Sequence, residues 1–318
     1  MKNTEKQLSS LSIMNGDIHT TDLTEPCLRK VLLRHQEKSE PVAPTALFRG
    51  LLAGKALEKL HFSGDVEECD YEVIWPELVA ELASEGREPS ESVITNRESI
   101  IGQVDTVVQT YKSRLMPLFD KCDVIGTELP CRLKIGEINF ASHVDLLVRD
   151  TDDVFGYGRG RILCIDWKFR EEVPTRAYLS RNLQFAMYWL AILEGSVMTF
   201  PAFDQWEELN ENAQMLWCHL PYLAPFKRKT TCKDADGNPV TYFKGDDRPI
   251  NNILRDVNFK TECIDSIKRD MTERVEVMRA GYFPKSPEPV RCTTCDVREF
   301  CNRGDTPELL ENQDAKSA

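Results

Sequence analysis

The stretch Ile162-Leu163-Cys164-Ile165-Asp166-Trp167-Lys168 decides how the rest of the chain is interpreted. Its first half is apolar without alternation, which is typical of a central β-strand buried on both faces. Side chains two residues apart on a strand point to the same side, so Asp166 and Lys168 are expected to project together from its end. An acid and an amine are costly to bury there unless they serve each other or a ligand.

A structural ion pair at a strand end would also explain this tripeptide. Asp145 favours a ligand site, because it lies on the preceding predicted strand and hairpin pairing would bring its carboxylate beside Asp166. Two carboxylates and the backbone carbonyl of Trp167 would form an oxygen-only set suited to Mg²⁺ or Mn²⁺. Lys168 would then orient or deprotonate the attacking water, or neutralise charge on a phosphate.

Hydrophobic periodicity predicts one α/β domain in which helices flank a central mixed sheet. The expected helices span residues 24–35, 45–60, 100–115, 178–193 and 257–279. The expected strands span residues 123–130, 131–135, 138–148, 162–169 and 215–223, with a further short strand at 71–75 and a hairpin turn at 236–238.

Bulk properties restrict the partners and the compartment. A formal net charge of −12 gives no general attraction to polyanions, so nucleic acid would be held by local basic patches and bound metal. The longest apolar run, Phe185–Leu193, is far shorter than the roughly 20 residues that span a bilayer, and the N-terminus lacks a signal-peptide pattern. We therefore expect an intracellular, cytoplasmic protein with no membrane contact, whose eleven cysteines are not disulfides by default.

Further residues stand in a fixed order around the tripeptide. Gly50 and Glu58 lie on a predicted helix upstream, and Gln184 and Tyr188 lie one helical turn apart downstream. With Asp145 between them, this order resembles the RecB-like branch of the PD-(D/E)xK nucleases, whose pattern is a helical G-x3-H-x2-L-E, a strand Asp, D/E-x-K and Q-x3-Y.

The resemblance implies a restriction-endonuclease-like core and a metal-dependent nuclease. It implies that Asp145 and Asp166 bind metal, that Lys168 is catalytic, and that the site or the DNA is supported by Glu58, Gln184 and Tyr188.

One position departs from the family pattern, because the family histidine aligns with Gly54. Glu58 or a water would compensate, or activity would be weaker or altered in metal preference. His143 and His61 are candidate substitutes, although each is equally well explained as an ordinary packing or surface histidine.

Four of the cysteines form a candidate metal site. Cys292, Cys295 and Cys301 give the spacing C-x2-C-x5-C, and Cys27 at the start of the first predicted helix is the candidate fourth ligand. Spacing leaves zinc and an iron–sulfur cluster open. The same arrangement resembles the iron–sulfur nucleases, namely the CRISPR-associated exonucleases and AddB-type nuclease domains, which implies a structural 4Fe–4S cluster.

These expectations assign the whole chain, 1–318, to a single nuclease domain. Residues 1–20 and 305–318 are expected to be disordered, 21–44 with 282–304 to form the iron–sulfur clasp, 45–200 to form the nuclease core, and 201–281 to hold a strand, a basic hairpin and a long helix.

Contacts to DNA are expected from arginines near the tripeptide and from the basic segment 227–233, with Tyr178 or Trp189 stacking on bases of a single strand. Dispersed arginines are equally normal on any surface, and Trp189 also fits a core. The arginines are Arg159, Arg161, Arg170, Arg176 and Arg181.

Three functions remain open at this point. The first is a metal-dependent exonuclease on single-stranded or overhanging DNA ends, working with a protein partner in DNA processing, recombination, repair, CRISPR spacer acquisition or antiviral defence. The second is a catalytically weakened or inactive iron–sulfur module that binds nucleic acid or a partner, motivated by Gly54. The third is a zinc-stapled protein without nuclease activity.

Overall fold

The structure is a computed structural model that describes residues 17–25, 27–35, 42–62, 69–170, 174–200, 205–222, 230–233, 239–242 and 249–280. Its centre is an eight-stranded sheet, in which seven strands follow the order β12-β9-β6-β5-β4-β7-β8 and β1 pairs with β5. The strands are β1 (Ile18–His19), β4 (Asp123–Ile135), β5 (Ile138–Asp150), β6 (Arg161–Lys168), β7 (Ser196–Phe200), β8 (Gln205–Glu207), β9 (Gln214–His219) and β12 (Leu254–Val257).

The sheet is mixed, as the sequence predicted. β4, β5 and β6 form an antiparallel meander, and β6 then runs parallel to β9. A parallel pair needs a crossover connection, and the chain between β6 and β9 supplies it through helices and the β7–β8 hairpin. All six middle residues of β6 are buried, which agrees with the unbroken apolar run in its sequence.

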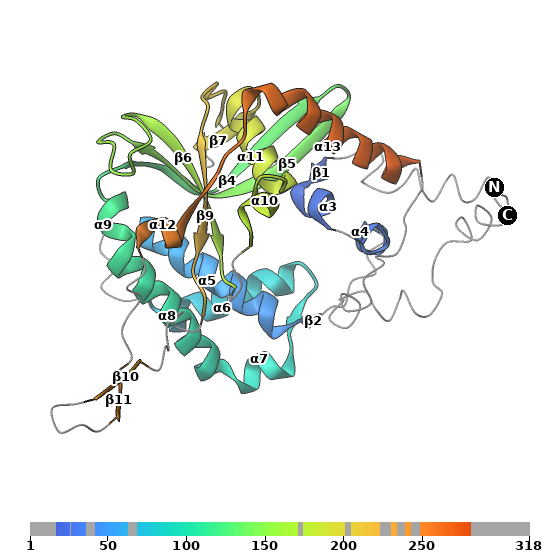
Figure 1. Cartoon of the computed structure of the whole chain (residues 1–318). Coiled ribbons are helices and arrows are strands. Elements are labelled where there is room, and N and C mark those ends of the chain that lie inside the picture. The colour runs from blue at the N-terminus through green and yellow to red at the C-terminus, as the bar shows by residue number, and fades with distance from the viewer. Residues whose placement is uncertain are drawn as a thin grey trace.

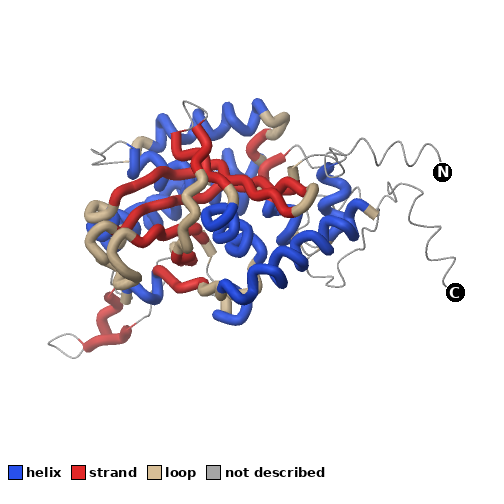
Figure 2. The backbone as a smooth tube through the Cα atoms, turned by 90° about the horizontal axis from the view of Figure 1, so that it is seen from above, coloured by secondary structure: helices blue, strands red, loops and turns tan. Residues whose placement is uncertain are grey.

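Helices cover both faces of this sheet, which Figure 2 shows as strands lying between two groups of helices. One face packs against α3 (Thr20–Thr24), α4 (Leu28–His35), α10 (Arg176–Leu179), α11 (Leu183–Glu194) and α13 (Ile264–Arg279). The other face packs against α5 (Thr45–Phe62), α6 (Tyr71–Ser84), α7 (Glu91–Thr95), α8 (Arg97–Arg114), α9 (Met116–Phe119) and α12 (Ile250–Ile253), as Figure 1 shows for most of them.

Smaller elements complete the described chain. A 3₁₀ turn, η2 (Thr261–Cys263), precedes α13. Two separate pairs of short strands are β2 (Val42–Ala43) with β3 (Glu88–Pro89), and β10 (Thr230–Lys233) with β11 (Pro239–Tyr242). The second pair is antiparallel, which agrees with the two strands of the predicted hairpin, and its expected turn at 236–238 lies outside the described residues.

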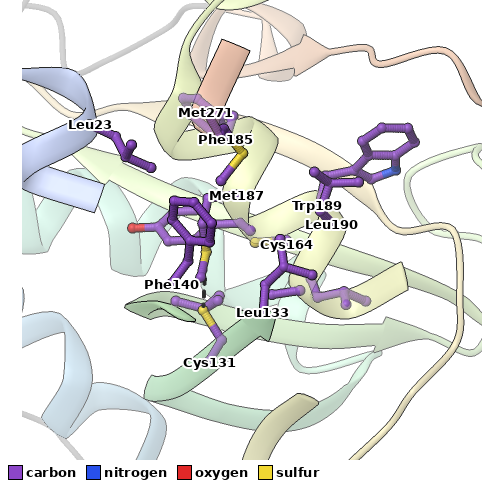
Figure 3. Packing of buried hydrophobic residues seen from close by; sticks show 14 of the residues in the cluster. Leu23, Cys131, Leu133, Phe140, Cys164, Phe185, Met187, Trp189, Leu190 and Met271 are labelled. Carbon is purple, nitrogen blue, oxygen red and sulfur yellow. Dashed lines mark hydrogen bonds between the residues drawn. The ribbon is translucent and has the colours of Figure 1, made fainter. Parts of the chain in front are cut away.

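Helix α11 is the hydrophobic centre of its layer. Its residues from Phe185 to Ile192 are all buried, because the helix is apolar on every side and neighbours enclose it. Figure 3 shows Met187 over Cys131 of β4, with their sulfur atoms 4.0 Å apart. The longest apolar run of the sequence is therefore a core helix. No helix in the described ranges is long and apolar enough to cross a membrane.

Three expectations about elements were wrong. The strand expected at 71–75 is the start of α6, because Asp70 caps a helix whose apolar residues Ile74, Leu78 and Leu82 recur every four positions. The N-terminal residues 17–20 are ordered rather than disordered, since Ile18 is buried against β5. The helix expected from 257 begins at Ile264, because β12 and η2 occupy the preceding residues.

The helix expected over residues 178–193 is also interrupted. Asn182 breaks it by capping α11, with its side-chain oxygen accepting a hydrogen bond from the Gln184 N–H at 2.8 Å. Strands β7 and β8 were not expected, and both are short strands on one side of the sheet.

Candidate active site

The site forms where strand pairing along β5 is interrupted. β6 pairs with β5 from Asp150 down to Leu146, and β1 pairs with β5 only at Phe140 and Ala141. The β5 residues from Ser142 to Asp145 lie between these two ladders. The ladder is interrupted only on this side of β5, since β4 continues to pair with β5 on the other side, so side-chain contacts replace the ladder toward β6.

Asp145 bridges β5 to β6 through one of these contacts. Its Oδ2 accepts a hydrogen bond of 2.6 Å from the backbone N–H of Trp167. Continuing the register beyond Leu146–Ile165 places Asp145 opposite Asp166. The predicted juxtaposition of these two carboxylates is thus present in the structure.

Lys168 joins the pair from the end of β6. Its ammonium nitrogen lies 2.7 Å from both carboxylate oxygens of Asp166, two residues earlier on the same strand. The Asp166 side chain is fully buried, whereas 20% of the Lys168 side chain is exposed. The Lys168 ammonium therefore neutralises a carboxylate that solvent does not reach, while part of the Lys168 side chain remains exposed.

Asp145, Asp166 and Lys168 form a charged trio whose electrostatics favour a bound cation. Burial raises the pKa of Asp145 well above its ordinary value, and the neighbouring Asp166 carboxylate raises it further. Burial also raises the pKa of Asp166, against the opposing attraction of Lys168. Burial alone would lower the pKa of Lys168, but the two aspartates outweigh it and raise that pKa. One ammonium thus faces two buried carboxylates, and a divalent cation would relieve their repulsion.

A cavity of about 560 Å³ opens beside the trio. Asp145, Trp167 and Lys168 form its wall on the sheet side, and helix α5 forms the opposite wall. The residues that α5 contributes are Gly50, Leu51, Gly54, Lys55 and Glu58. The helix that carries Glu58 is therefore brought to the strands that carry Asp145 and Lys168, as the order of motifs predicts.

Glu128 on β4 also lines this cavity, and the sequence analysis missed it. Its neighbours Thr127 and Leu129 pair with Leu146 and Val144, which places Glu128 opposite Asp145. Burial raises the pKa of Glu128 to about 7, and the negative charge of Glu58 adds to this effect.

The backbone of Glu128 is also unusual. Its φ of 48° lies in the left-handed region, which non-glycine residues adopt rarely and at a cost. The sequence signal that could have identified Glu128 is an acidic residue inside a predicted strand, between Gly126 and Pro130.

The remaining acidic residue of the motif, Glu58, has a charged environment. Burial raises its pKa, Lys55 opposes that rise, and Glu81 reinforces it. Lys55 forms an ion pair of 2.5 Å with Glu81, so the α5–α6 side of the cavity also mixes both signs of charge. The cavity is lined with carboxylates from α5, α6, β4 and β5.

Gly54 lies on the cavity wall, where the family pattern has histidine. A Cβ atom added there would meet no heavy atom within 4 Å, so the space is open rather than filled by a neighbour. Within the described part of the chain, the position is thus compatible with a larger side chain.

The two candidate substitute histidines lie in different places. His143 lines the cavity, and burial lowers its pKa. His61 instead contacts the Tyr111 hydroxyl at 2.7 Å and stacks on the Trp167 ring, on the packed side of the site. Of the two, only His143 faces the cavity that the carboxylates line.

Gln184 and Tyr188 stand behind Asp145 rather than in the cavity. The Gln184 amide donates to the Tyr188 hydroxyl at 2.7 Å. Burial raises the pKa of Tyr188, and the neighbouring Ser142 side chain on β5 opposes that rise. Ser142 in turn lies 2.7 Å from the Thr20 hydroxyl of α3. This buried network fixes the β5 segment that carries Asp145, and it ties α3 and α11 to that segment.

The arginines do not all lie near the trio. Arg161 begins β6, so at about 3.3 Å per residue it lies roughly 16 Å from Asp166 and roughly 23 Å from Lys168 along the strand, and Arg159 precedes it. Arg170 is exposed beside Asp166, and its charge lowers the pKa of that carboxyl. Trp189 is buried, with its indole N–H donated to Asn212, so it belongs to the core.

Parts of the predicted site lie outside the described residues. Cys292, Cys295 and Cys301 fall in the undescribed range 281–318, and the basic residues Lys227, Arg228 and Lys229 fall in 223–229. Cys27 is described: it is half-buried directly before α4, and its N–H donates to the Glu25 carboxylate at 3.2 Å.

The donor chemistry of the trio fits an oxygen-binding divalent cation, but with few side-chain ligands. Among the residues that the structure describes, no group of three or more His, Cys, Asp or Glu side chains could hold a metal ion. Two aspartates and water would suit Mg²⁺, which keeps several waters and needs only one or two carboxylates.

Comparison with known proteins identifies the chain at the level of a family. The family model described as "PD-(D/E)XK nuclease superfamily" matches residues 23–302, which include every motif residue named above. No curated protein matches the chain. A solved structure titled "Crystal structure of SSO0001" aligns over 87% of this chain and 94% of that chain, at 12% identity and a TM-score of 0.31. The family match is therefore the comparison that carries weight.

Proposed function

The chain belongs to the PD-(D/E)XK nuclease superfamily, and we propose that it is a Mg²⁺- or Mn²⁺-dependent deoxyribonuclease that acts as an exonuclease on single-stranded or overhanging DNA ends. The observation that supports the proposal is the buried pair Asp145–Asp166 with Lys168 2.7 Å from Asp166, where Asp145 and Lys168 line a cavity of about 560 Å³. Superfamily membership implies a metal-dependent nuclease, and the exonuclease form rests on the resemblance to RecB-like enzymes.

Each residue of the trio has a defined part in the proposed hydrolysis. Asp145, Asp166 and the backbone carbonyl of Trp167 would hold the cation. Bound Mg²⁺ or Mn²⁺ supplies a Lewis acid that polarises the phosphoryl group and lowers the pKa of a bound water. The Lys168 ammonium orients the attacking water or stabilises the charge that develops on the phosphate. The water oxygen bonds to phosphorus and its proton passes to solvent, while the bond to the leaving sugar oxygen breaks and that oxygen takes a proton from solvent.

The supporting residues act from both sides of the trio. Glu58 reaches the same cavity from α5. Gln184 and Tyr188 hold the Ser142 end of the Asp145 segment through the hydroxyl network. Glu128, opposite Asp145, adds a carboxylate whose position suits a water-mediated contact to the cation.

A second part of the proposal concerns the cysteines. Cys27, Cys292, Cys295 and Cys301 would hold a structural 4Fe–4S cluster that joins the N-terminal helix to the C-terminal segment, with zinc as the alternative metal. The half-buried position of Cys27 directly before α4 suits a ligand that faces a neighbouring segment. The biological setting would be DNA processing, recombination, repair, or CRISPR spacer acquisition in antiviral defence, with a protein partner.

The alternative function is a weakened or inactive module that binds nucleic acid or a partner. Gly54 favours it, because the cavity lacks a side chain at the position of the family histidine. Glu128 and His143 favour the active form, because they line the same cavity as Asp145 and Lys168.

The test compares linear single-stranded DNA with covalently closed circular single-stranded DNA, each with Mn²⁺ and with EDTA. An exonuclease releases short products from labelled linear DNA and leaves the circle intact. Cleavage of the circle would replace the exonuclease with an endonuclease. Absence of cleavage on both substrates would favour the binding module.

A further inference from the structure

A second cavity, of about 430 Å³, lies between α3 and the segment that joins α10 to α11. Its volume is within the range of about 300–1,000 Å³ that small-molecule sites occupy. The lining residues are Leu23, Thr24, Tyr178, Arg181, Asn182 and Leu183.

This cavity combines an apolar floor, an aromatic ring and a positive charge. Leu23 is almost fully buried and Leu183 is half-buried, so both present apolar surface. Tyr178 is 56% exposed, and it is the one aromatic among the large hydrophobic residues that are exposed in the described ranges. An exposed ring beside an apolar wall is suited to stacking on another flat ring.

Arg181 supplies the charge on the same side. It is exposed, and its backbone N–H donates to the Tyr178 carbonyl at 3.1 Å, so the two residues are held in one turn of the chain. Among the described residues the structure pairs no acidic side chain with its guanidinium. On a protein with a net charge of −12, such a local cation is what a phosphate requires.

The cavity is connected to β5, the strand that carries Asp145, through the contact between the Thr20 and Ser142 hydroxyls. Thr20, one helical turn before Leu23 and Thr24 on α3, contacts Ser142, which is three residues from Asp145. One helical turn and three strand residues together span on the order of 15 Å. About four or five stacked nucleotides cover that distance, at 3.4 Å each.

We propose that this cavity is a nucleobase subsite for the DNA strand, in which one base stacks on Tyr178 and the adjacent phosphate pairs with Arg181. The inference rests on the proposed function for the identity of the ligand, a single-stranded oligodeoxynucleotide. The subsite holds the strand at a fixed distance from the bond that Asp145 and Lys168 attack.

Substitutions of Tyr178 and Arg181 should change DNA binding in different ways, one through the affinity and the other through its salt dependence. Loss of base stacking weakens binding of single strands by roughly 5- to 150-fold, so Tyr178→Ala should do so while Tyr178→Phe keeps the affinity. Loss of one phosphate contact lowers the slope of log K against log salt by about 0.7, so Arg181→Ala should change this slope and Tyr178→Ala should not. Arg269→Ala is the matched control, since Arg269 is an exposed arginine on α13, 3.8 Å from Glu273.

The position of the base is tested by photo-crosslinking. A short oligodeoxynucleotide carries one 5-iododeoxyuridine, moved one position at a time, and is irradiated with the full-length protein in EDTA so that cleavage does not interfere. The subsite predicts cross-links to Tyr178 from one or two adjacent positions, which Tyr178→Ala abolishes. Cross-links confined to other residues, equal cross-linking from every position, or an oligonucleotide that does not bind would each overturn it.

Cleavage is measured separately with Mn²⁺. A protein that cross-links at Tyr178 but never cleaves would retain the subsite and refute the exonuclease. A protein that cleaves but gives no cross-link at Tyr178 would retain the exonuclease and refute the subsite. If the cavity binds a ligand other than DNA, Tyr178→Ala and Arg181→Ala will both bind the oligonucleotide with the affinity of the wild type. That result would also refute the proposal.

Discussion

The Asp145 carboxylate accepts a hydrogen bond of 2.6 Å from the backbone N–H of Trp167, across the point where β5 and β6 stop pairing as a ladder. This contact fixes Asp145 beside Asp166 without using a second side chain. As a result, the buried carboxylates of Asp145 and Asp166 repel each other, and the Lys168 ammonium is the cation that they share. In the proposed mechanism, metal binding, stability and catalysis are therefore linked at one place in the fold.

The first prediction concerns this repulsion. Asp145→Asn removes one of the two buried negative charges and keeps an oxygen that can accept from Trp167. We expect the metal-free variant to be at least as stable as the metal-free wild type. Mn²⁺ at about 100 times its dissociation constant should stabilise the wild type by about 2.7 kcal/mol and the variant much less. Thermal unfolding with EDTA and with Mn²⁺ measures both effects, and equal stabilisation of the two proteins would show that Asp145 does not bind metal.

The second prediction concerns Gly54. Gly54→Ala should fold and gain about 0.5–1 kcal/mol of stability, because alanine is the better helix residue and its Cβ meets open space. Gly54→His should fold equally well and bind Mn²⁺ more tightly, because its imidazole enters the cavity that Asp145 lines. Calorimetric titration of Mn²⁺ compares the two variants. The same affinity in both would mean that the imidazole adds no ligand.

The third prediction concerns His61. Burial lowers its pKa to about 4 in the folded protein, from an ordinary value of 6.5. The unfolded chain therefore binds more protons between these pH values, so stability falls as the pH drops from 6.5 towards 4. The loss approaches about 3 kcal/mol when the whole window is crossed.

Urea unfolding at several pH values tests the sign and the source of this effect. His61→Gln keeps a polar group near the Tyr111 hydroxyl but cannot titrate, so its stability should depend less steeply on pH than that of the wild type. His143, whose pKa burial also lowers, remains in both proteins and cancels in the comparison. Parallel pH profiles would refute the assignment to His61.

The fourth prediction concerns the cysteines. Anaerobically purified protein should be brown and contain iron, and Cys292→Ala should lose the iron and unfold at a lower temperature, because metal ligation is coupled to folding. Cys263→Ala is the control, since Cys263 is exposed in the η2 turn and has no part in the proposed clasp. A colourless wild type with stoichiometric zinc would replace the cluster with a zinc site.

Much of the site was predictable because its signals are local. β6 has an unbroken apolar run, and a Gly- and Asp-rich turn joins it to β5, so the adjacency of Asp145 and Asp166 follows from hairpin pairing. Glu58 was placed by helical periodicity over α5 and by the order of motifs.

The features that the sequence patterns did not predict depend mostly on contacts between segments that are distant in the chain. Glu128 lies opposite Asp145 only through the register of β4 with β5, which the sequence does not reveal by itself. Strand β1 has two residues and is defined by its pairing with Phe140 and Ala141, more than a hundred positions away. Helix α6 was taken for a strand at its start because the five residues 71–75 are too few to display the four-residue recurrence.

The central claim is that Asp145, Asp166 and Lys168 form one hydrolytic centre. End-labelled single-stranded DNA with Mn²⁺, incubated with wild type and with Lys168→Ala at equal folded concentration, tests it most directly. We expect the wild type to shorten the DNA, EDTA to stop this cleavage, and Lys168→Ala to fold but to cleave about 10²–10⁴-fold more slowly. Equal rates for the wild type and Lys168→Ala would contradict it.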